Sequence, residues 1–463
     1  MEVGGEGANV FFLEDHDMFF VNRGLATDQL TSINKKKFNR ALKGRGTDWE
    51  IPLIDNVFGL GKSTFGDNYI RKCREIWQAK VDANPEKLTN PEGFMPVLCQ
   101  CHTIHITLEP GSLSPDNLHD RYEMDKKIVR LICRYFDHKL QARPEALSEG
   151  SVGKMQSSGE VLEILTAEVG PLFIVLDVIG RGFEDENIDK FGQRELFMRF
   201  CRVVLMKWLP IPKVFFLLAG RASFLSYVGL RPGPGLEAIQ ASPFKFFRLS
   251  LHRLRWDAIA DIITYTLVDE IEKKTIQQHF DLNAEQVAEV AHNLFDVTLG
   301  HPRSLLAAFQ KCRSYDDLVH YDEIDMPDFI DWVEFSKRIA SYAEPLGTMM
   351  SRAIDSVTVN MADTWEDVGG EKVFYDTIAN GVGIAWEGTL DKATLYLPPF
   401  IQQMILAFLY PLRKYLLKVA KSKVSLDYPA VFEWVCLKRF QELFDKNMKS
   451  HGCPKDTLPV FFY

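Results

Sequence analysis

The chain has 463 residues, of which 46% are hydrophobic and 25% are charged, and 33 are phenylalanine. A chain of this length can bury a large core without disulfides or metal ions, and at about 150 residues per domain its length predicts roughly three units. The composition excludes a chain that is disordered, collagen-like or coiled-coil as a whole. The formal net charge of −9 repels phosphate, so a nucleic-acid surface would have to be local.

Hydrophobic periodicity predicts strands that alternate with helices in the first half of the chain, and mainly helices after about residue 252. The expected strands cover 49–55, 97–107, 171–177 and 214–218. The expected helices cover 26–42, 63–80, 125–136 and 190–207, and the expected loops cover 143–158 and 221–248. This order is typical of an α/β domain with a parallel sheet, followed by helical subdomains. We therefore divide the chain into an N-terminal lead-in (1–48), a sheet core (49–250), a helical lid (251–340) and a helical extension (341–463).

Targeting segments are not expected. The N-terminus carries acids where a secretory signal needs bases. No window has 18 uninterrupted apolar residues, and the nearest, 398–417, contains Gln402, Gln403 and Pro411. We therefore expect no signal peptide, no membrane span and no membrane partner, and an intracellular location.

The eight cysteines are scattered, which suits a reducing compartment. One tight group, formed by Cys99, Cys101, His102 and His105, could hold a metal ion. The alternative is a strand in which Cys99 and Cys101 share a face with Thr103, while His102 lies on the other face with Ile104. A C-x-C pattern on a strand without a second cysteine pair makes a poor zinc site, so we favour the strand.

The segment from Asn56 to Thr64, NVFGLGKST, lies between an expected strand and an expected helix, as a nucleotide phosphate loop requires. Backbone N–H groups and the helix dipole favour an anion at such a helix N-terminus. Gly61 permits close approach to phosphate, Lys62 would meet the β- and γ-phosphates, and Ser63 would offer its hydroxyl to Mg²⁺. Asn56 stands where the usual pattern has glycine, and asparagine tolerates positive φ. The alternative is a plain glycine-rich turn into a helix. The residues predicted to bind the nucleotide are Asn56, Gly59, Gly61, Lys62, Ser63 and Thr64.

A second motif is the apolar strand 173–177, which ends in Asp177. An acid at this place holds Mg²⁺ in P-loop NTPases. The alternative is a strand that ends in a turn residue. Many such ATPases carry a glutamate directly after this acid to activate water, but here that position is Val178, and Glu184 and Asp185 lie in the next segment. The sequence therefore predicts magnesium binding at Asp177 and leaves hydrolysis open.

Two arginines complete the candidate site. Arg221 ends the segment FFLLAGR, residues 215–221, which follows the apolar strand, and it could sense the γ-phosphate or stabilise developing charge there. The alternative is a solvated arginine at a strand end. In Gly300-His301-Pro302-Arg303, Gly300 can end one helix and Pro302 can start the next, so a plain helix–turn–helix is one interpretation. The other makes Arg303 a second sensor on the helical lid.

These four elements in this order resemble the NTPase module of Crinkler-type effectors and of retrotransposon hot spot (RHS) proteins, over roughly residues 15–463. The stretches that carry the resemblance are FFVNRGLATDQL, IPLIDNVFGLGKSTFG, QCHTIHITLEPGSL, PLFIVLDVIG, FFLLAGR and GHPRSLL, followed by YPAVFEWVCLKRFQELF and LPVFFY. The resemblance implies a P-loop ATPase of the AAA+/STAND-like type that binds ATP and Mg²⁺, with a location in the nucleus, including a host nucleus. It implies that Lys62 and Ser63 bind phosphate and Mg²⁺, that Asp177 is the Walker B acid, and that Arg221 and Arg303 are sensors.

Proteins of this kind often end in a restriction-enzyme-like nuclease, and FEWVCLKRFQELF resembles the start of that domain, with Glu433 as its first acid. A nuclease also needs a carboxylate pair and a lysine around metal. The one ExK triplet, Glu272-Lys273-Lys274, lies in a charge-rich stretch typical of a solvated face, and the chain ends at Tyr463. We therefore expect that the nuclease is lost or that the gene model is truncated, and that the N-terminal delivery header of many Crinklers is missing.

Three functions follow from these patterns. The loop and Asp177 favour an ATPase or a nucleotide-gated switch, for which Lys62→Ala should abolish ATP·Mg²⁺ binding. Val178 favours a module that holds ATP with weak or no hydrolysis and docks a protein partner through residues 325–463. A homo-oligomer is a further possible assembly. The third is a fragment of an ATP-gated nuclease. Its best local support is the basic run from Lys35 to Arg40, but such a run is usually a solvated helix face, and the net charge does not support a nucleic-acid partner.

Overall fold

The structure is a computed structural model, and it describes most of the chain between residues 20 and 396. The described residues are 20–21, 23–44, 49–55, 59–83, 92–114, 123–139, 157–184, 188, 190–220, 244–249, 251–269, 274–321, 339, 341–354, 358–366, 372–382, 384–389 and 392–396. They form three units, each with its own apolar core.

The first unit is built on a five-stranded parallel sheet with the strand order β2-β3-β4-β1-β5. Its strands are β1 (Trp49–Ile54), β2 (His102–Thr107), β3 (Leu172–Asp177), β4 (Val214–Ala219) and β5 (Phe244–Arg248). β3 and β4 are buried over their whole length, as expected for apolar strands covered on both faces. Because the strands are parallel, their C-terminal ends meet at one edge of the sheet, where Thr107 pairs with Asp177.

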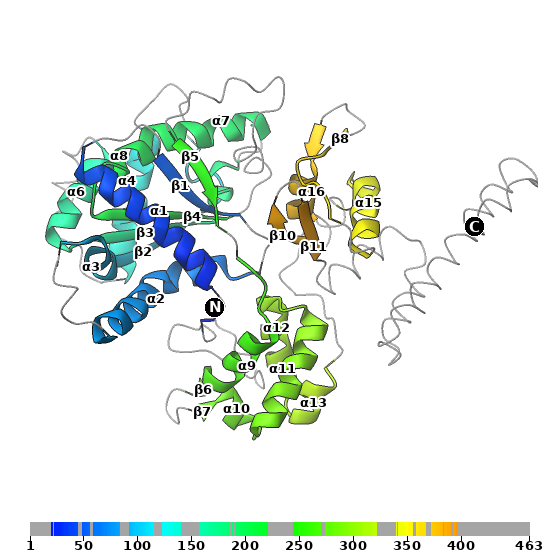
Figure 1. Ribbon diagram of the computed structural model, residues 1–463. Helices are drawn as coiled ribbons and strands as arrows, with labels where there is room; N and C mark the ends of the chain where they lie inside the picture. The colour runs from blue at the N-terminus through cyan, green and yellow to red at the C-terminus, as the bar shows by residue number, and fades with distance from the viewer. Residues whose placement is uncertain are drawn as a thin grey trace, which may run out of the picture.

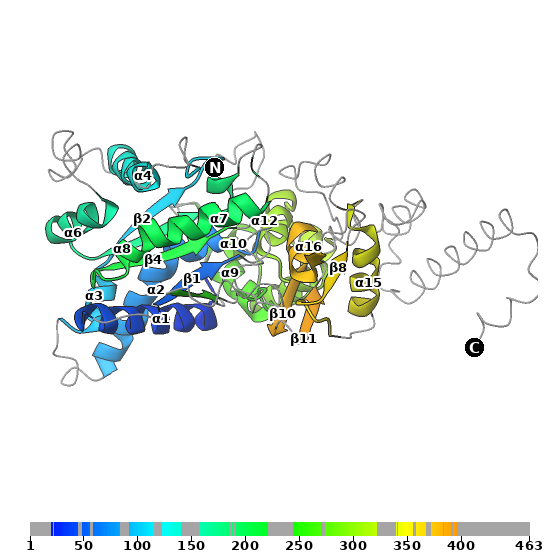
Figure 2. The same ribbon diagram turned by 90° about the horizontal axis from the view of Figure 1, so that it is seen from above.

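Helices cover both faces of the sheet (Figures 1 and 2). One face carries α1 (Gly24–Leu42), α2 (Lys62–Ala83) and α3 (Phe94–Cys99). The other carries α4 (Glu123–Lys139), α6 (Ser158–Glu168), a 3₁₀ turn (Arg181–Phe183), α7 (Lys190–Phe200), a π-helical turn (Cys201–Leu205) and α8 (Met206–Trp208). Alternate residues of β3 enter the two cores, because successive side chains of a strand point to opposite faces. Ile174 and Leu176 face α4, whereas Phe173 and Val175 face α2.

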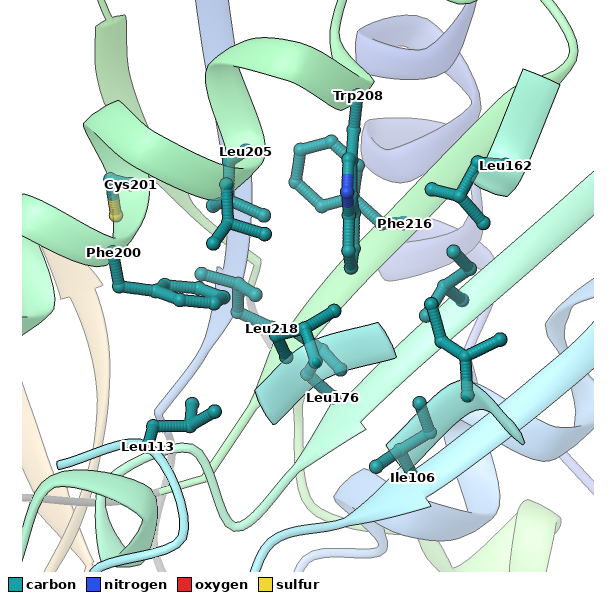
Figure 3. Packing of buried hydrophobic residues seen from close by; sticks show 14 of the residues in the cluster. Ile106, Leu113, Leu162, Leu176, Phe200, Cys201, Leu205, Trp208, Phe216 and Leu218 are labelled. Atoms are coloured by element: carbon teal, nitrogen blue, oxygen red, sulfur yellow. The ribbon is translucent and has the colours of Figure 1, made fainter. Parts of the chain in front are cut away.

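Figure 3 shows part of the core on the α4 side, where the indole of Trp208 stands close to Phe216 with ring centroids 5.9 Å apart. A buried polar network lies beside it. Trp208 Nε1 donates to Ser158 Oγ at 2.9 Å, Ser158 Oγ donates to Asp125, and Lys207 Nζ donates to the second oxygen of Asp125. The buried Asp125 carboxylate is thus paired and hydrogen-bonded, which removes most of its desolvation cost and ties α4, α6 and α8 together.

Residues 251–269 and 274–321 form a helical unit around a second core. Its helices are α9 (Trp256–Tyr265), α10 (Ile276–His279), α11 (Ala284–Thr298), α12 (Pro302–Lys311) and α13 (Tyr315–Val319), with a short hairpin of β6 (Leu267–Asp269) and β7 (Lys274–Thr275). α11 is followed by Leu299 and Gly300, whose φ angles are +50° and +70°, and Pro302 begins α12. The prediction that Gly300 ends one helix and Pro302 begins the next is confirmed.

The described residues between 339 and 396 form the third unit around a separate core. It contains α15 (Ala343–Ile354), β8 (Thr364–Glu366), β9 (Lys372–Phe374), α16 (Tyr375–Val382), β10 (Ala385–Thr389) and β11 (Lys392–Tyr396). β8 pairs antiparallel with β9, and β10 with β11. Figure 1 shows this unit in yellow and orange, next to both the sheet unit and the helical unit.

Most elements expected in the first half are confirmed within a few residues of the expected bounds. β5 lies inside the segment that was expected to be a loop, and the expectation of helices alone after residue 252 is wrong, because the second and third units contain six strands among the described residues. Each of these strands has five residues or fewer, so its alternation is too brief to be told from a helical period. The segments 143–156 and 221–243 lie outside the described residues, and the four-part division of the chain stays a prediction.

The strand expected over 97–107 is only half right. Residues 94–99 form α3, which Gly93 precedes, and β2 begins at His102. Pro96 lies in the first turn of this helix, where its missing N–H costs nothing. Cys99 therefore belongs to a helix and does not share a strand face with Cys101 and Thr103. Within the described part of the chain, no group of three or more His, Cys, Asp or Glu side chains is placed to hold a metal ion, and no helix is long and apolar enough to cross a membrane.

Candidate functional site

The predicted phosphate loop follows β1 at the C-terminal edge of the sheet. Gly59 and Gly61 both have φ of +82°, a left-handed conformation that glycine adopts without steric cost. α2 begins at Lys62, and the N–H of Phe65 bonds to the carbonyl of Gly61 at 2.9 Å. The loop therefore leads directly into a helix N-terminus, which is an anion-binding arrangement. Asn56 lies outside the described residues.

Asp177, at the end of β3, meets the start of α2. Ser63 Oγ donates a hydrogen bond of 2.5 Å to Asp177 Oδ2, and the N–H of Val178 donates to Oδ1 at 2.8 Å. Burial raises the pKa of Asp177, but hydrogen bonds from His105 and Ser63 outweigh it and hold the pKa below its ordinary value. A carboxylate and a hydroxyl are hard oxygen ligands, and Mg²⁺ in phosphate-handling sites is commonly held by one or two carboxylates plus phosphate oxygens. These two residues therefore fit a magnesium ion bound together with a nucleotide.

Val178 directly follows Asp177, and its backbone conformation is unusual. Its φ of +55° is left-handed, which is a strained conformation for a β-branched residue. Gly220, at the end of β4, packs against it: a Cβ on Gly220 would lie 2.5 Å from the N of Ile179 and 2.8 Å from the Cα of Val178. The close packing of these backbones holds Val178 in this conformation beside Asp177.

His105 is a site residue that the sequence analysis weighed only as a metal ligand or strand residue. From β2 it contacts two carboxylates: its Nε2 lies 3.3 Å from Asp177 Oδ2, and its Nδ1 lies 2.5 Å from Asp67 Oδ1. Burial lowers the pKa of His105, but the hydrogen bonds and charges of Asp177 and Asp67 outweigh it and raise the pKa to about 9. The sequence offers one signal for this contact. Asp67, one of the two partners of His105, lies four residues after Ser63 and therefore on the same face of α2.

Arg23 is a second site residue that the sequence analysis did not single out. Its guanidinium is buried, donating from Nη2 to the Leu60 carbonyl at 2.7 Å and from Nη1 to the His252 carbonyl at 2.5 Å. Burial lowers its pKa to about 10, so it stays charged at neutral pH. The Nη2 atom lies 3.7 Å from where a Cβ on Gly61 would be. Arg23 thus joins the start of α1, the phosphate loop and the segment that leads into the helical unit.

The helical unit touches the loop through the start of α12. A Cβ on Gly59 would lie 2.5 Å from Cε1 of His301 and 3.0 Å from Cβ of Arg303. His301 is fixed there because its Nδ1 accepts a hydrogen bond from the N–H of Ser304 and caps α12. Burial lowers the pKa of Arg303. The structure therefore brings one predicted sensor, Arg303, to the loop, whereas Arg221 lies outside the described residues.

The third unit reaches the same edge of the sheet through a buried charge cluster. Arg248, at the end of β5, forms ion pairs with Asp55 at 2.9 Å and with Asp376 of α16 at 3.0 Å. Trp386 Nε1 donates to the other oxygen of Asp376 at 3.1 Å. Burial and the charge of Asp376 raise the pKa of Asp55 to about 6, against the opposing effect of Arg248.

An aromatic contact adds to this junction. The ring of Tyr396, at the end of β11, packs on Leu60 of the loop, and the guanidinium of Arg253 lies 3.5 Å from the ring centroid. Such cation–π contacts stabilise by about 0.5–2 kcal/mol. All three units therefore meet at residues that flank the phosphate loop.

Together, the strand order, the glycine-bearing loop between β1 and α2, and the acid at the end of β3 define the fold of a P-loop NTPase of the AAA+/STAND-like type. The fold class expected from the sequence, a parallel sheet domain followed by helical units, is confirmed.

The chain matches no family model and no curated protein. Among solved structures, it resembles the Aeropyrum pernix ORC2 protein in its ADPNP-ADP complexes, with 15% identity, a TM-score of 0.38, and 84% of this chain and 95% of that chain covered. With the ADP form of the same protein, the identity is 13% and the TM-score is 0.32, and 86% of this chain and 96% of that chain are covered. It also resembles a chain of the E. coli MS115-1 HORMA:CdnC:Trip13 complex, with 13% identity, a TM-score of 0.24, and 67% and 91% covered.

The resemblance to Crinkler-type effectors and retrotransposon hot spot proteins is wrong as a family assignment. No family model supports it, and the solved structures named above are of other proteins. The effector role, the nuclear location and the nuclease start at Glu433 rested on that resemblance and have no other support. Glu433 lies outside the described residues.

Proposed function

We propose that this chain binds ATP with Mg²⁺ and acts as a nucleotide-gated switch. The hydrogen bond between Ser63 and Asp177 carries the proposal. It brings together two side chains that are 114 residues apart, one at the start of α2 and one at the end of β3, directly beside Lys62. A hydroxyl, a carboxylate and a lysine at a helix N-terminus below a glycine loop form a set that suits a nucleoside triphosphate with magnesium.

In this proposal, the loop residues hold the phosphates and Lys62 neutralises the β- and γ-phosphates. Ser63 and Asp177 would hold Mg²⁺, which neutralises phosphate charge when it is bound. Arg303 would sense the γ-phosphate from the helical unit, because α12 already contacts Gly59. Arg221, which follows β4 by two residues in the sequence, would act as a further sensor. The complete set of proposed site residues is Asn56, Gly59, Gly61, Lys62, Ser63, Thr64, Asp177, Arg221 and Arg303.

Lys62→Ala is expected to weaken ATP·Mg²⁺ binding at least about tenfold, because a hydrogen bond to a charged group contributes about 1.5–3 kcal/mol. Isothermal titration calorimetry with a nonhydrolysable ATP analogue measures the change. The matched control is Lys72→Ala on the same helix, where Lys72 forms an exposed ion pair with Glu75. Equal heats for the wild type and Lys62→Ala would sink the proposed function.

Retention of ATP with little or no turnover is a second candidate function, and it is favoured by Val178. General acid–base groups accelerate reactions by about 100- to 10,000-fold, and no acid directly follows Asp177. Asp177 would then serve binding while ATP persists in the site.

Val178→Glu is therefore expected to raise phosphate release at least about tenfold above the wild-type rate, because it restores a carboxylate at the position of a water-activating base. Steady-state phosphate release under saturating ATP·Mg²⁺ measures this rate. Val178→Gln is the matched control, since glutamine has the same size as glutamate but lacks a basic carboxylate. The opposite result is that the wild type releases phosphate steadily, that Asp177→Asn abolishes this release, and that Val178→Glu does not increase it. This result would show that another group activates water. The expected homo-oligomer or protein partner stays a prediction.

A further inference from the structure

We propose that His105, supported by Asp67, is a positioning residue that orients Asp177 for magnesium and thereby sets the magnesium affinity of the site. This inference rests on the proposed function, because it concerns the same acid.

The contacts of His105 form a continuous chain across the sheet edge. Its Nε2 lies 3.3 Å from Asp177 Oδ2, and its Nδ1 lies 2.5 Å from Asp67 Oδ1. Ser63 Oγ reaches the same Oδ2 atom at 2.5 Å. Asp177 Oδ2 is therefore fixed from two sides, by a hydroxyl from α2 and by an imidazole from β2.

The location of His105 suits an indirect role. In the register of β2 and β3, Thr107 pairs with Asp177, and His105 pairs with Val175, two residue pairs deeper into the sheet and therefore on the same face. The phosphate loop follows the C-terminal end of β1, whereas His105 contacts Asp177 from a position inside the sheet.

Asp67 fixes the ring of His105. Asp67 is on α2, four residues after Ser63, so the two side chains project from the same face of the helix. A ring held at both nitrogens cannot flip or rotate freely, and the carboxylate that it contacts loses the same freedom. Groups that orient metal ligands in this way typically change metal affinity by about 10- to 100-fold when they are removed.

This arrangement also connects the metal site to the body of the sheet unit. The side chain of His105 is largely buried, whereas Asp67 is about half exposed. The histidine is thus held by packing as well as by its two partners. His102, on the same strand, is exposed and contacts neither carboxylate through any hydrogen bond or ion pair seen among the described residues.

His105→Ala is expected to lower the apparent affinity for Mg²⁺ by about 10- to 100-fold in the presence of ATP, while nucleotide affinity in EDTA changes less than about threefold. Nucleotide affinity is measured by calorimetry over a series of Mg²⁺ concentrations and in EDTA. Asp67→Asn should shift the magnesium dependence in the same direction by a smaller factor. His105→Gln, whose amide can donate to Asp177, should restore part of it. His102→Ala on β2 and Asp82→Asn on α2 are the matched controls, and both should match the wild type.

Binding of Mn²⁺ alone, measured by electron paramagnetic resonance, separates this inference from the proposed function. If the wild type binds Mn²⁺ more tightly than His105→Ala but binds no nucleotide, the positioning role stands and the proposed function fails. If His105→Ala weakens nucleotide binding equally with Mg²⁺ and in EDTA, the histidine is merely structural and the inference is overturned. Equal Mn²⁺ and Mg²⁺ affinities in the wild type and His105→Ala would overturn it as well, whatever the nucleotide affinity.

Discussion

Replacing Arg248 with methionine is expected to lower the free energy of unfolding by about 3–5 kcal/mol, because it removes one partner from a buried ion cluster. Arg248 lies between two acids that are largely shielded from water, and Asp376 is fully buried. Without the guanidinium, Asp55 and Asp376 would face each other as two uncompensated carboxylates. Urea denaturation followed by tryptophan fluorescence measures the change, and Trp386 reports on it directly, since its indole bonds to Asp376.

Arg255→Met is the matched control for this prediction. Arg255 pairs with Asp257 at 3.0 Å, but its side chain is 70% exposed, and exposed pairs contribute about 0–1 kcal/mol. A second test combines Arg248→Met with Asp55→Asn and Asp376→Asn, which removes the repulsion and should recover part of the lost stability. An Arg248→Met protein as stable as Arg255→Met would mean that the cluster does not hold the third unit against the sheet.

The parts of the site that could be predicted from the sequence are those whose signal is local. The phosphate loop is one segment flanked by a strand and a helix, and the strand that ends in Asp177 is one uninterrupted apolar run. Each motif can be identified without knowledge of its neighbours. The sheet then brings Ser63 and Asp177 together, because Asp177 ends β3 and Ser63 begins the helix that follows the loop after β1, at the same edge of the parallel sheet.

The parts that could not be predicted depend on contacts between distant segments. Arg23 touches Leu60 and His252, which are 37 and 229 residues away, so no short pattern contains this contact. Arg248 and Asp376 are 128 residues apart, and each alone resembles an ordinary charged surface residue. The expected strand at Cys99 failed for a related reason, because apolar residues of a short helix and a short strand share the same composition. The family resemblance is wrong for another reason, because short motifs of this kind are common to many P-loop proteins and do not specify one family.

The geometry around the loop gives the proposed switch a physical route. Gly59 contacts α12 of the helical unit, Leu60 contacts Tyr396 of the third unit, and Arg23 contacts both Leu60 and the segment before α9. A nucleotide that alters the loop therefore changes contacts with two other units at once. Because packed interfaces change between discrete arrangements rather than deforming gradually, a small shift at the loop can be amplified into a movement of either unit.

Gly300→Ala tests this route at its tightest point. Gly300 has φ of +70°, and a Cβ there would lie 1.9 Å from the carbonyl oxygen of Leu254, so the backbone itself must move. The left-handed conformation alone costs alanine about 1–2 kcal/mol, and the clash adds to it, so we expect a loss of more than about 2 kcal/mol in unfolding free energy. His301 follows directly, so its contact with Gly59 should also loosen and weaken ATP·Mg²⁺ binding.

Gly347→Ala is the matched control for Gly300→Ala, because Gly347 lies within α15, and beyond the backbone of its own helix no atom of the described residues lies within 4 Å of an added Cβ. This change should stabilise the third unit by about 0.5–1 kcal/mol, since alanine is the better helix former. Urea denaturation and nucleotide calorimetry on the same two variants separate the effect on stability from the effect on ATP·Mg²⁺ binding. If Gly300→Ala loses stability but binds ATP·Mg²⁺ like the wild type, the contact between α12 and the loop does not serve the nucleotide site, and the helical unit is not the moving part of the switch.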